Sequence, residues 1–265
     1  MLEYLSTYKQ TILGEYYKAI KTPIVYLVFI ASFLVVLGVS IVYLINVAGM
    51  VDLNTNPWDH FINRTLAVNA IFMMLPFVVL LTSYSTYLEV RSNTWKYLYT
   101  LPQNRSVVYV SKLMVIIGML MISLLTYGAL VLVLGLFLDI AYPIFEFRYY
   151  VPDFSLFLYD VTHLFVALLG VISFQYWLSI RTKSIILPIG VGLLGFMIGF
   201  VLFTANNAYA DYFPYAFAMK IKGFSMVKNS SADFCAWWGM SGGINAAACI
   251  GFTLLGVYQE RGVRG

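Results

Sequence analysis

Residues 87–112 read YLEVRSNTWKYLYTLPQNRSVVYVSK, a charged and aromatic-rich stretch between two long apolar runs. The run before it, about 66–88, and the run after it, about 113–138, are each long enough to cross a bilayer, since a crossing takes about 20 apolar residues. The stretch is therefore a loop that joins two membrane spans on one side of the membrane. It has two predicted spans before it and four after it.

The composition is that of a membrane protein. Of 265 residues, 61% are hydrophobic and only 11% are charged, whereas an ordinary globular domain has about 25% charged residues. We predict a single all-α polytopic membrane domain over 1–265, because helices satisfy their own backbone hydrogen bonds in lipid. Six stretches are apolar over the length of one crossing: about 24–50, 66–88, 113–138, 157–180, 185–205 and 236–258. The first is too long for the core of a signal peptide, so we expect it to remain as a span.

The lysine and arginine residues indicate the orientation. With both termini and the 87–112 and 181–184 loops on one side of the membrane, that side holds eleven of the sixteen basic residues and the other side five. Basic residues are enriched on the cytoplasmic side, so both termini are predicted to be cytoplasmic. The net charge of +4 comes without a basic stripe, and we predict no nucleic-acid partner.

The segments outside the spans have patterns of their own. Residues 1–22 are predicted to form an interfacial helix, because aromatic and apolar residues recur at four-residue spacing up to Pro23. Residues 50–64 contain the turn-forming Asn56 and Pro57 and are predicted as an outer loop, with Trp58 as an interfacial anchor. Residues 206–234 are too aromatic for a solvated loop and are predicted as re-entrant or interfacial helices between spans five and six.

Small residues recur along the fifth and sixth predicted spans. They allow helix backbones to approach closely in lipid, where apolar burial does not drive packing. Contacts within the chain and contacts across a dimer explain them equally well. The residues are Gly192, Gly195 and Gly199 in the fifth span, and Gly239, Gly243, Ala247 and Gly251 in the sixth.

Asp160 and His163 lie one helical turn apart in the fourth predicted span and therefore on one face of the helix. Ionisable groups at membrane depth are unfavourable and often functional, so a proton-relay or ligand site is one interpretation. Their position near the outer end of the span favours the other, a boundary position that water reaches. Further along this span, Gln175 and Ser179 are expected to make interhelical hydrogen bonds.

The chain has no sequence motif for driving transport by itself. No G-x-x-x-x-G-K-[ST] phosphate loop, H-E-x-x-H metal motif or G-x-S-x-G elbow occurs. Ion-coupled carriers usually have ionisable groups at membrane depth, and with Asp160 at a boundary only His163 is such a group here. We predict no catalytic site, metal or cofactor on this chain, and an energy source on another polypeptide.

The 87–112 loop is the segment best suited to receive that energy through contact with another polypeptide. Residues 87–100 are predicted to form a helix with Leu88, Trp95 and Leu98 near one face. Pro102 ends this helix, and Ser106 is expected to cap the next one. A plain interfacial anchor explains the pattern equally well.

The loop also resembles a known family. It carries an acidic residue, an aromatic run, a Leu-Pro and two basic residues in a fixed order: Glu89, 94–98, 100–102, Arg105 and Lys112. This order resembles the signature between spans two and three of ATP-binding-cassette type-2 permeases, and the size is similar to that of the lantibiotic- and bacitracin-immunity type. Asn93 and Thr94 stand where the family often has a glycine.

The resemblance implies a pair of permeases, identical or related, in a bacterial cytoplasmic membrane. Each would bind a separate cytoplasmic ATPase subunit that holds ATP and Mg²⁺. The 87–100 helix would be the coupling helix that seats in this ATPase. Its contact residues would be Glu89, Arg91, Trp95, Lys96, Leu98, Leu101, Pro102 and Arg105.

The predicted function is therefore that of the permease subunit of an ATP-driven exporter. Its cargo would be an amphipathic peptide, an antibiotic or a lipid-linked molecule that leaves the cytoplasmic membrane. Two alternatives stay open at this point. One is an intramembrane lipid-modifying enzyme built on Asp160 and His163, and the other is a non-transporting anchor or sensor that recruits a cytoplasmic partner.

Overall fold

The computed structural model describes residues 2–47, 56–91, 105–182, 184–205, 208–220 and 242–262, and the regular elements within these ranges are all helical. The predicted all-α class is confirmed. The long helices are α1 (Leu2–Ile20), α2 (Ile24–Ile45), α4 (Pro57–Val68), α5 (Leu75–Arg91), α7 (Arg105–Ala141), α8 (Phe154–Thr182), α9 (Ile186–Thr204) and α12 (Gly243–Gly262). The short ones are the π turn η1 (Asn69–Met74), the 3-10 turns η2 (Pro143–Phe145), η3 (Phe147–Tyr149) and η4 (Ala208–Asp211), and α10 (Pro214–Met219).

Five helical stretches are long and apolar enough to cross a membrane: Ile24–Ile45, Pro57–Leu88, Arg105–Ala141, Phe154–Thr182 and Ile186–Thr204. They correspond to the first five predicted spans, although their ends differ from the predicted ends. The sixth prediction, 236–258, begins on residues outside the described ranges. There α12 contributes a shorter apolar helix from Gly243 to Gln259, so the total of six spans stays a prediction.

The second span begins earlier than predicted. Asn56 and Pro57 do not form a loop but start α4, so the predicted outer loop is wrong from residue 57 onward. The Asn56 side chain accepts a hydrogen bond from the Trp58 backbone N–H at 3.0 Å, as an N-cap residue does. Pro57 occupies the first turn, where a missing N–H donor does no harm. From α4 the chain continues through η1 into α5 without a break in helical structure.

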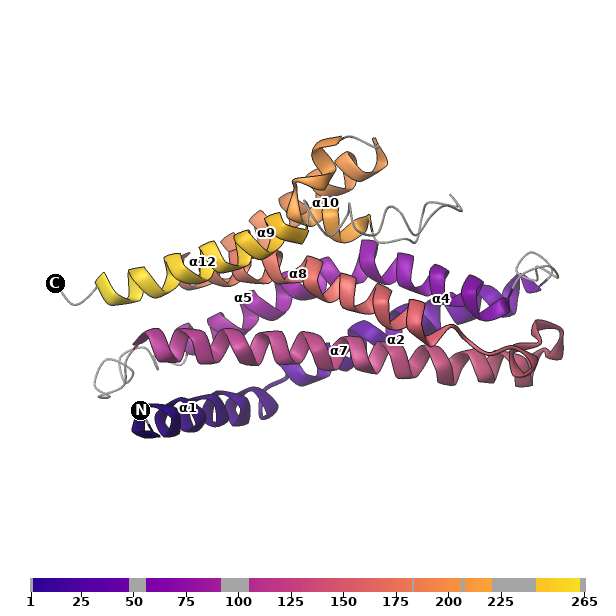
Figure 1. Cartoon of the computed structure of the whole chain (residues 1–265), viewed down its shortest axis with the longest axis horizontal. Helices are drawn as coiled ribbons and strands as arrows, with labels where there is room; N and C mark the ends of the chain where they lie inside the picture. Colours follow the sequence, from indigo (N-terminus) through magenta and orange to yellow (C-terminus); the bar gives the residue numbers. More distant parts are fainter. Residues whose placement is uncertain are drawn as a thin grey trace.

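The helices lie roughly along one common axis (Figure 1). The longest, α7, packs against α2, α1, α12 and α8, while α8 also packs against α5, α9 and α10. The start of α1, the end of α5, the start of α7 and the end of α12 all lie at one end of the molecule (Figure 1). The connection between α7 and α8 lies at the opposite end. The end of α5 and the start of α7, which flank residues 92–104, are thus at the same end of the molecule as the start of α1 and the end of α12.

The helix α1 turns polar side chains toward the protein and apolar ones away from it. Thr11 and Glu15 are buried, while Ile12, Tyr16 and Ile20, members of the four-residue repeat, are exposed. α1 packs mainly on α7. Exposed apolar side chains on an amphipathic helix are typical of contact with a lipid surface.

Apolar side chains also cover the outside of the spans. On α9, the least enclosed of the five, Leu193, Leu194, Met197, Ile198 and Val201 are all exposed. A surface of this kind is stable against lipid or another apolar chain. The composition predicts a lipid bilayer as a partner, and these exposed apolar faces agree with that prediction.

Candidate coupling site

The predicted coupling segment lies between the end of α5 and the start of α7. α5 continues through Tyr87 to Arg91, so residues 87–91 belong to the helix of the second span and do not start a separate helix. α7 begins at Arg105, which places Ser106 inside its first turn and not ahead of it. The other predicted contact positions lie outside the described residues: Trp95, Lys96, Leu98, Leu101, Pro102 and the side chain of Glu89.

The start of α7 is fixed firmly to neighbouring helices. The Tyr109 ring lies against the Tyr176 ring of α8 with 4.8 Å between centroids, and the Tyr176 hydroxyl donates to the Tyr109 carbonyl at 3.2 Å. Gly256 of α12 lies so close to the Tyr109 ring that no Cβ fits between them. Val107 and Lys112 are also buried. Of the two helices that carry the predicted segment, α7 therefore supplies a rigid base.

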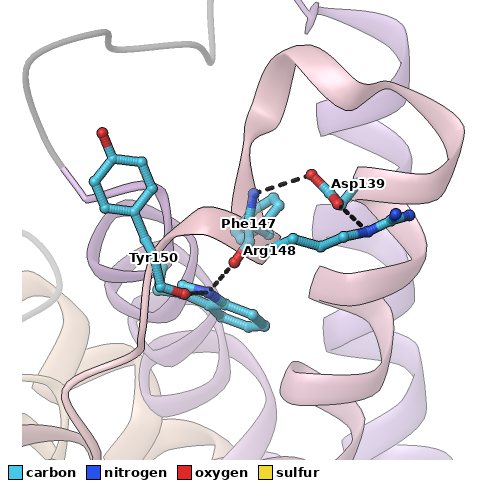
Figure 2. Close-up of polar contacts among 5 residues, drawn as sticks. Asp139, Phe147, Arg148 and Tyr150 are labelled. Carbon is cyan, nitrogen blue, oxygen red and sulfur yellow. Dashed lines mark hydrogen bonds and ion pairs between the residues drawn. The ribbon is translucent and has the colours of Figure 1, made fainter.

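At the opposite end of the molecule, a buried carboxylate organises the connection between α7 and α8. Asp139, near the end of α7, accepts a hydrogen bond from the Phe147 backbone N–H at 3.0 Å through Oδ1. Its Oδ2 lies 2.7 Å from Arg148 Nε (Figure 2). The side chain of Asp139 is only 5% exposed, so the ion pair and the backbone donor together satisfy a carboxylate that would otherwise be unfavourable to bury.

Trp58 ties this connection to the second span. Its indole Nε1 donates to the carbonyls of Phe147 at 2.9 Å and of Tyr150 at 3.1 Å (Figure 2). The indole ring packs edge-on against Phe147 and lies directly over Gly135 of α7, where an added Cβ would fall 2.6 Å from ring carbon Cζ3. Trp58 is therefore not the interfacial anchor that was predicted but a buried contact among α4, α7 and η3.

The turn between η2 and η3 depends on Glu146, which has a left-handed backbone with φ of 55°. This conformation costs a residue other than glycine about 1–2 kcal/mol. The flanking Phe145 and Phe147 are both buried, at 4% and 1% exposure. Their burial holds the turn in place against its conformational preference.

Asp160 and His163 are both buried in α8, at 4% and 6% exposure. The protein thus encloses both side chains, while their depth in the membrane stays a prediction. Within the part of the chain that the structure describes, no group of three or more His, Cys, Asp and Glu residues is placed to hold a metal ion. A role of this pair in transport stays a prediction.

The glycines of the fifth span face other parts of the same chain. An added Cβ on Gly192 would fall 2.5 Å from Val79 Cγ1 of α5. On Gly195 it would fall 2.9 Å from the Tyr215 ring, and on Gly199 3.0 Å from the backbone N of Ala216. Together these glycines form the surface on which α5 and α10 pack against α9.

The small residues of α12 differ from those of α9. No atom of the described residues lies within 4 Å of a Cβ added to Gly243 or Gly251, and Ala247 is exposed. Gly239 lies outside the described ranges. A role of these four positions in a dimer interface stays a prediction.

Gln175 of α8 joins three helices through one side chain. In the amide orientation that satisfies both of its atoms, the oxygen accepts from the Tyr215 hydroxyl at 2.6 Å and from the Gly192 N–H at 3.2 Å, and the nitrogen donates to the Pro188 carbonyl at 3.2 Å. Burial raises the pKa of the Tyr215 hydroxyl to about 12, so this group stays protonated and donates. Gln175 thus makes the predicted interhelical hydrogen bonds. Ser179, in contrast, donates to the Gln175 carbonyl within α8 at 2.7 Å.

The roles of Trp58 and Tyr215 were not predicted from the sequence. Trp58 directly follows Asn-Pro, a pair found at helix starts as well as in turns, so a helix start was one possible prediction, but the pair gives no signal for the inward position of Trp58. Tyr215 lies in an aromatic segment after Pro214. No spacing rule relates that position to Gln175, forty residues earlier.

Comparison with known proteins tests the predicted family. No curated protein matches the chain, and no solved structure matches it. A family model described as ABC-2 family transporter protein matches residues 11–199, a range that runs from α1 to the end of the glycine series in α9 and includes the whole 87–112 loop. Because the match covers well over half of the sequence, this chain belongs to the ABC-2 family of transporter proteins.

Proposed function

We propose that this chain is the permease subunit through which an ATP-driven exporter moves an amphipathic peptide, an antibiotic or a lipid-linked molecule out of the bacterial cytoplasmic membrane. The family match supports the permease role. The observation that carries the proposal is the position of the two helix ends that flank residues 92–104. The end of α5 and the start of α7 both lie at the end of the molecule where α1 begins and α12 finishes (Figure 1).

That end of the molecule is the cytoplasmic one in our proposal, because most basic residues belong to it. A separate ATPase subunit that holds ATP and Mg²⁺ docks there, and a second permease, identical or related, completes the transporter. Trp95 and Leu98 supply apolar contacts to the ATPase. Glu89, Arg91 and Arg105 supply polar ones.

Motion of the ATPase is transmitted into the membrane through α5 and α7, the helices that flank residues 92–104. The start of α7 is packed against Tyr176 and Gly256 and serves as the fixed side. A shift of the ATPase on ATP binding then moves the end of α5 relative to α7. Cargo leaves on the outer side of the membrane, past residues 206–234, and within this range α10 packs on the glycines of α9.

Trp95→Ala tests the docking segment in the reconstituted complex of permease and ATPase. Buried tryptophans at protein interfaces contribute about 2 kcal/mol or more when truncated to alanine, which corresponds to about 30-fold in affinity. We expect binding of the ATPase to weaken by that factor and cargo-stimulated ATP turnover to fall accordingly. Fluorescence titration of labelled ATPase against permease in lipid nanodiscs measures the affinity.

Tyr149→Ala is the matched control, because Tyr149 is an aromatic residue that is 83% exposed at the opposite end of the molecule. It should leave ATPase affinity unchanged. Native affinity and turnover in the Trp95 variant would show that residues 92–104 are not the docking segment. Loss of activity on replacing both Asp160 and His163 with alanine, while ATPase binding is retained, would favour a buried reaction site over an export pathway.

A further inference from the structure

The helices α8 and α12 pack along each other toward the end of the molecule that we assign to the cytoplasm. Their contacts advance in step along both helices. The Ser173 hydroxyl donates to Cys249 Sγ at 3.1 Å, and one turn further the Trp177 indole N–H donates to Gln259 Oε1 at 3.2 Å. The two helices therefore run parallel here, and the end of α8 lies beside the end of α12 (Figure 1).

Three aromatic rings form a half-buried surface along this contact, which we call the aromatic ledge: Phe174 and Trp177 of α8, and Phe252 of α12. The Phe252 ring centroid lies 5.1 Å from that of Phe174 and 5.7 Å from that of Trp177. Leu255, one helical turn after Phe252, is 47% exposed. The surface beside the two helix ends is thus apolar and partly open. A tryptophan at the edge of such a surface is typical of the boundary between membrane and water.

Arg181 lies at the edge of the aromatic ledge, one helical turn after Trp177. Its side chain is exposed, and its Cζ atom lies 5.6 Å from the centroid of the Trp177 ring, within the range of a cation–π contact. Among the residues that the structure describes, no carboxylate forms an ion pair with Arg181. Its guanidinium is therefore a positive charge placed beside an apolar surface, with N–H donors open to a ligand.

The helix end alone explains only part of this arrangement. Arg181 is in the last turn of α8, where the partial negative charge of a helix end favours a cation. This accounts for the charge but not for its contact with Trp177 or for the ledge beside it. Arg91 is likewise an exposed residue in the last turn of its helix, α5. Within the described ranges it has no such contact with a ring.

A phosphate group attached to apolar chains matches both parts of this surface. Guanidinium groups bind phosphate oxygens through paired N–H donors, and acyl chains can cover the aromatic ledge and Leu255. In the sequence the two helix ends are basic on balance, with Lys183 and Arg261 against Glu260, which favours an anionic over a zwitterionic headgroup. Basic pockets between membrane helices on the cytoplasmic side bind anionic lipid headgroups in this way.

We propose that Arg181 and the aromatic ledge bind one anionic phospholipid of the inner leaflet. The lipid phosphate accepts hydrogen bonds from Arg181, and the acyl chains lie along the ledge and Leu255. Trp177 is the positioning residue that keeps the guanidinium at the edge of the ledge. The membrane supplies this ligand, so the inference goes beyond the proposed function and uses only its orientation, to name the leaflet.

Arg181→Gln tests the site by removing the charge and keeping a polar side chain. The probe is phosphatidylglycerol, titrated against the purified full chain in detergent and measured by native mass spectrometry, with phosphatidylcholine of the same acyl chains as the zwitterionic reference. We expect the unmodified chain to bind phosphatidylglycerol at least tenfold more tightly than phosphatidylcholine. Arg181→Gln should lower the affinity for phosphatidylglycerol at least fivefold. Arg181→Lys, which keeps the charge but not the paired donors, should give an intermediate loss.

Two further variants separate the site from a general effect of charge. Arg91→Gln removes an equal charge from an exposed position at the same end of the molecule and should change the affinity for phosphatidylglycerol less than twofold. Trp177→Leu keeps Arg181 but removes the ring, and should lower that affinity about threefold, the usual size of an exposed cation–π contact. If Trp177→Leu does not fold, the exposed Arg181 variants remain the test.

The lipid site is refuted if the unmodified chain binds both lipids equally, or if Arg181→Gln keeps the preference for phosphatidylglycerol. Full displacement of the lipid by soluble glycerol phosphate would also contradict it, because the acyl chains would then contribute nothing. Weaker ATPase binding by Arg181→Gln with an unchanged lipid preference would place Arg181 in the ATPase interface instead. The lipid titration needs no ATPase, so a failure of the proposed function leaves its result unaffected.

Discussion

Trp58→Ala is expected to lower the free energy of unfolding by about 3–5 kcal/mol, the usual range for deletion of a buried large aromatic side chain. Trp58 is 3% exposed and fills the space over Gly135, so its removal leaves a cavity between α4 and α7. The carbonyls of Phe147 and Tyr150 also lose their common donor. Thermal denaturation in detergent, followed by size-exclusion chromatography, should show an earlier transition and less monodisperse protein.

Trp58→Phe separates the two contributions. It keeps most of the ring volume and loses the indole N–H, so we expect a smaller loss of about 1–3 kcal/mol from the unpaired carbonyls. Equal losses for the two variants would mean that the hydrogen bonds alone fix the connection between α7 and α8. A native transition temperature in the alanine variant would contradict the contact among α4, α7 and η3.

Gly192→Leu is expected to have the second largest effect, about 3 kcal/mol or more, at the upper end of what overpacking of a core produces. The added Cβ alone would lie 2.5 Å from Val79 Cγ1 and 2.6 Å from the side-chain amide of Gln175. The side chain would therefore push α9 away from α5 and break the hydrogen bonds by which Gln175 holds Tyr215. Loss of the fully folded population in detergent, measured by the same thermal assay, checks this.

Gly190→Leu provides a control in the same helix. Gly190 is exposed, and no atom of the described residues lies within 4 Å of a Cβ added there. The substitution should be neutral or slightly stabilising, since glycine in a helix interior is less favourable than residues with a side chain by about 0.5–1 kcal/mol. Equal behaviour of the two leucine variants would show that α9 does not pack on α5 and α8 through Gly192.

Much of the fold was predictable because each membrane span can be recognised from its own composition. About 20 mainly apolar residues have few alternatives to a membrane helix, and the five helical stretches that are long and apolar enough to cross a membrane were all predicted in this way. The family was accessible for a similar reason, since the order of residues from Glu89 to Lys112 is local in the sequence. The match over residues 11–199 agrees with it.

The boundaries and the internal contacts were harder to predict for a physical reason. Asn56 and Pro57 favour turns and helix starts alike, and only the burial of Trp58 decides between them. Asp160 lies near a helix end, where its exposure depends on how the neighbouring helices pack against α8. The π turn Asn69–Met74 comes just before Pro76, which lacks the N–H donor that an α-helix would need there, but no pattern of apolar residues reveals the turn.

The most direct test of the account is the isolation of this chain, with an affinity tag, from its native membrane under mild detergent. We predict that an ATPase with a phosphate-loop motif is recovered with it in stoichiometric amount, and that ATP hydrolysis by the isolated complex rises when amphipathic peptides are added. Recovery of the folded chain without any such ATPase would contradict the central claim that its transport is driven by a separate subunit.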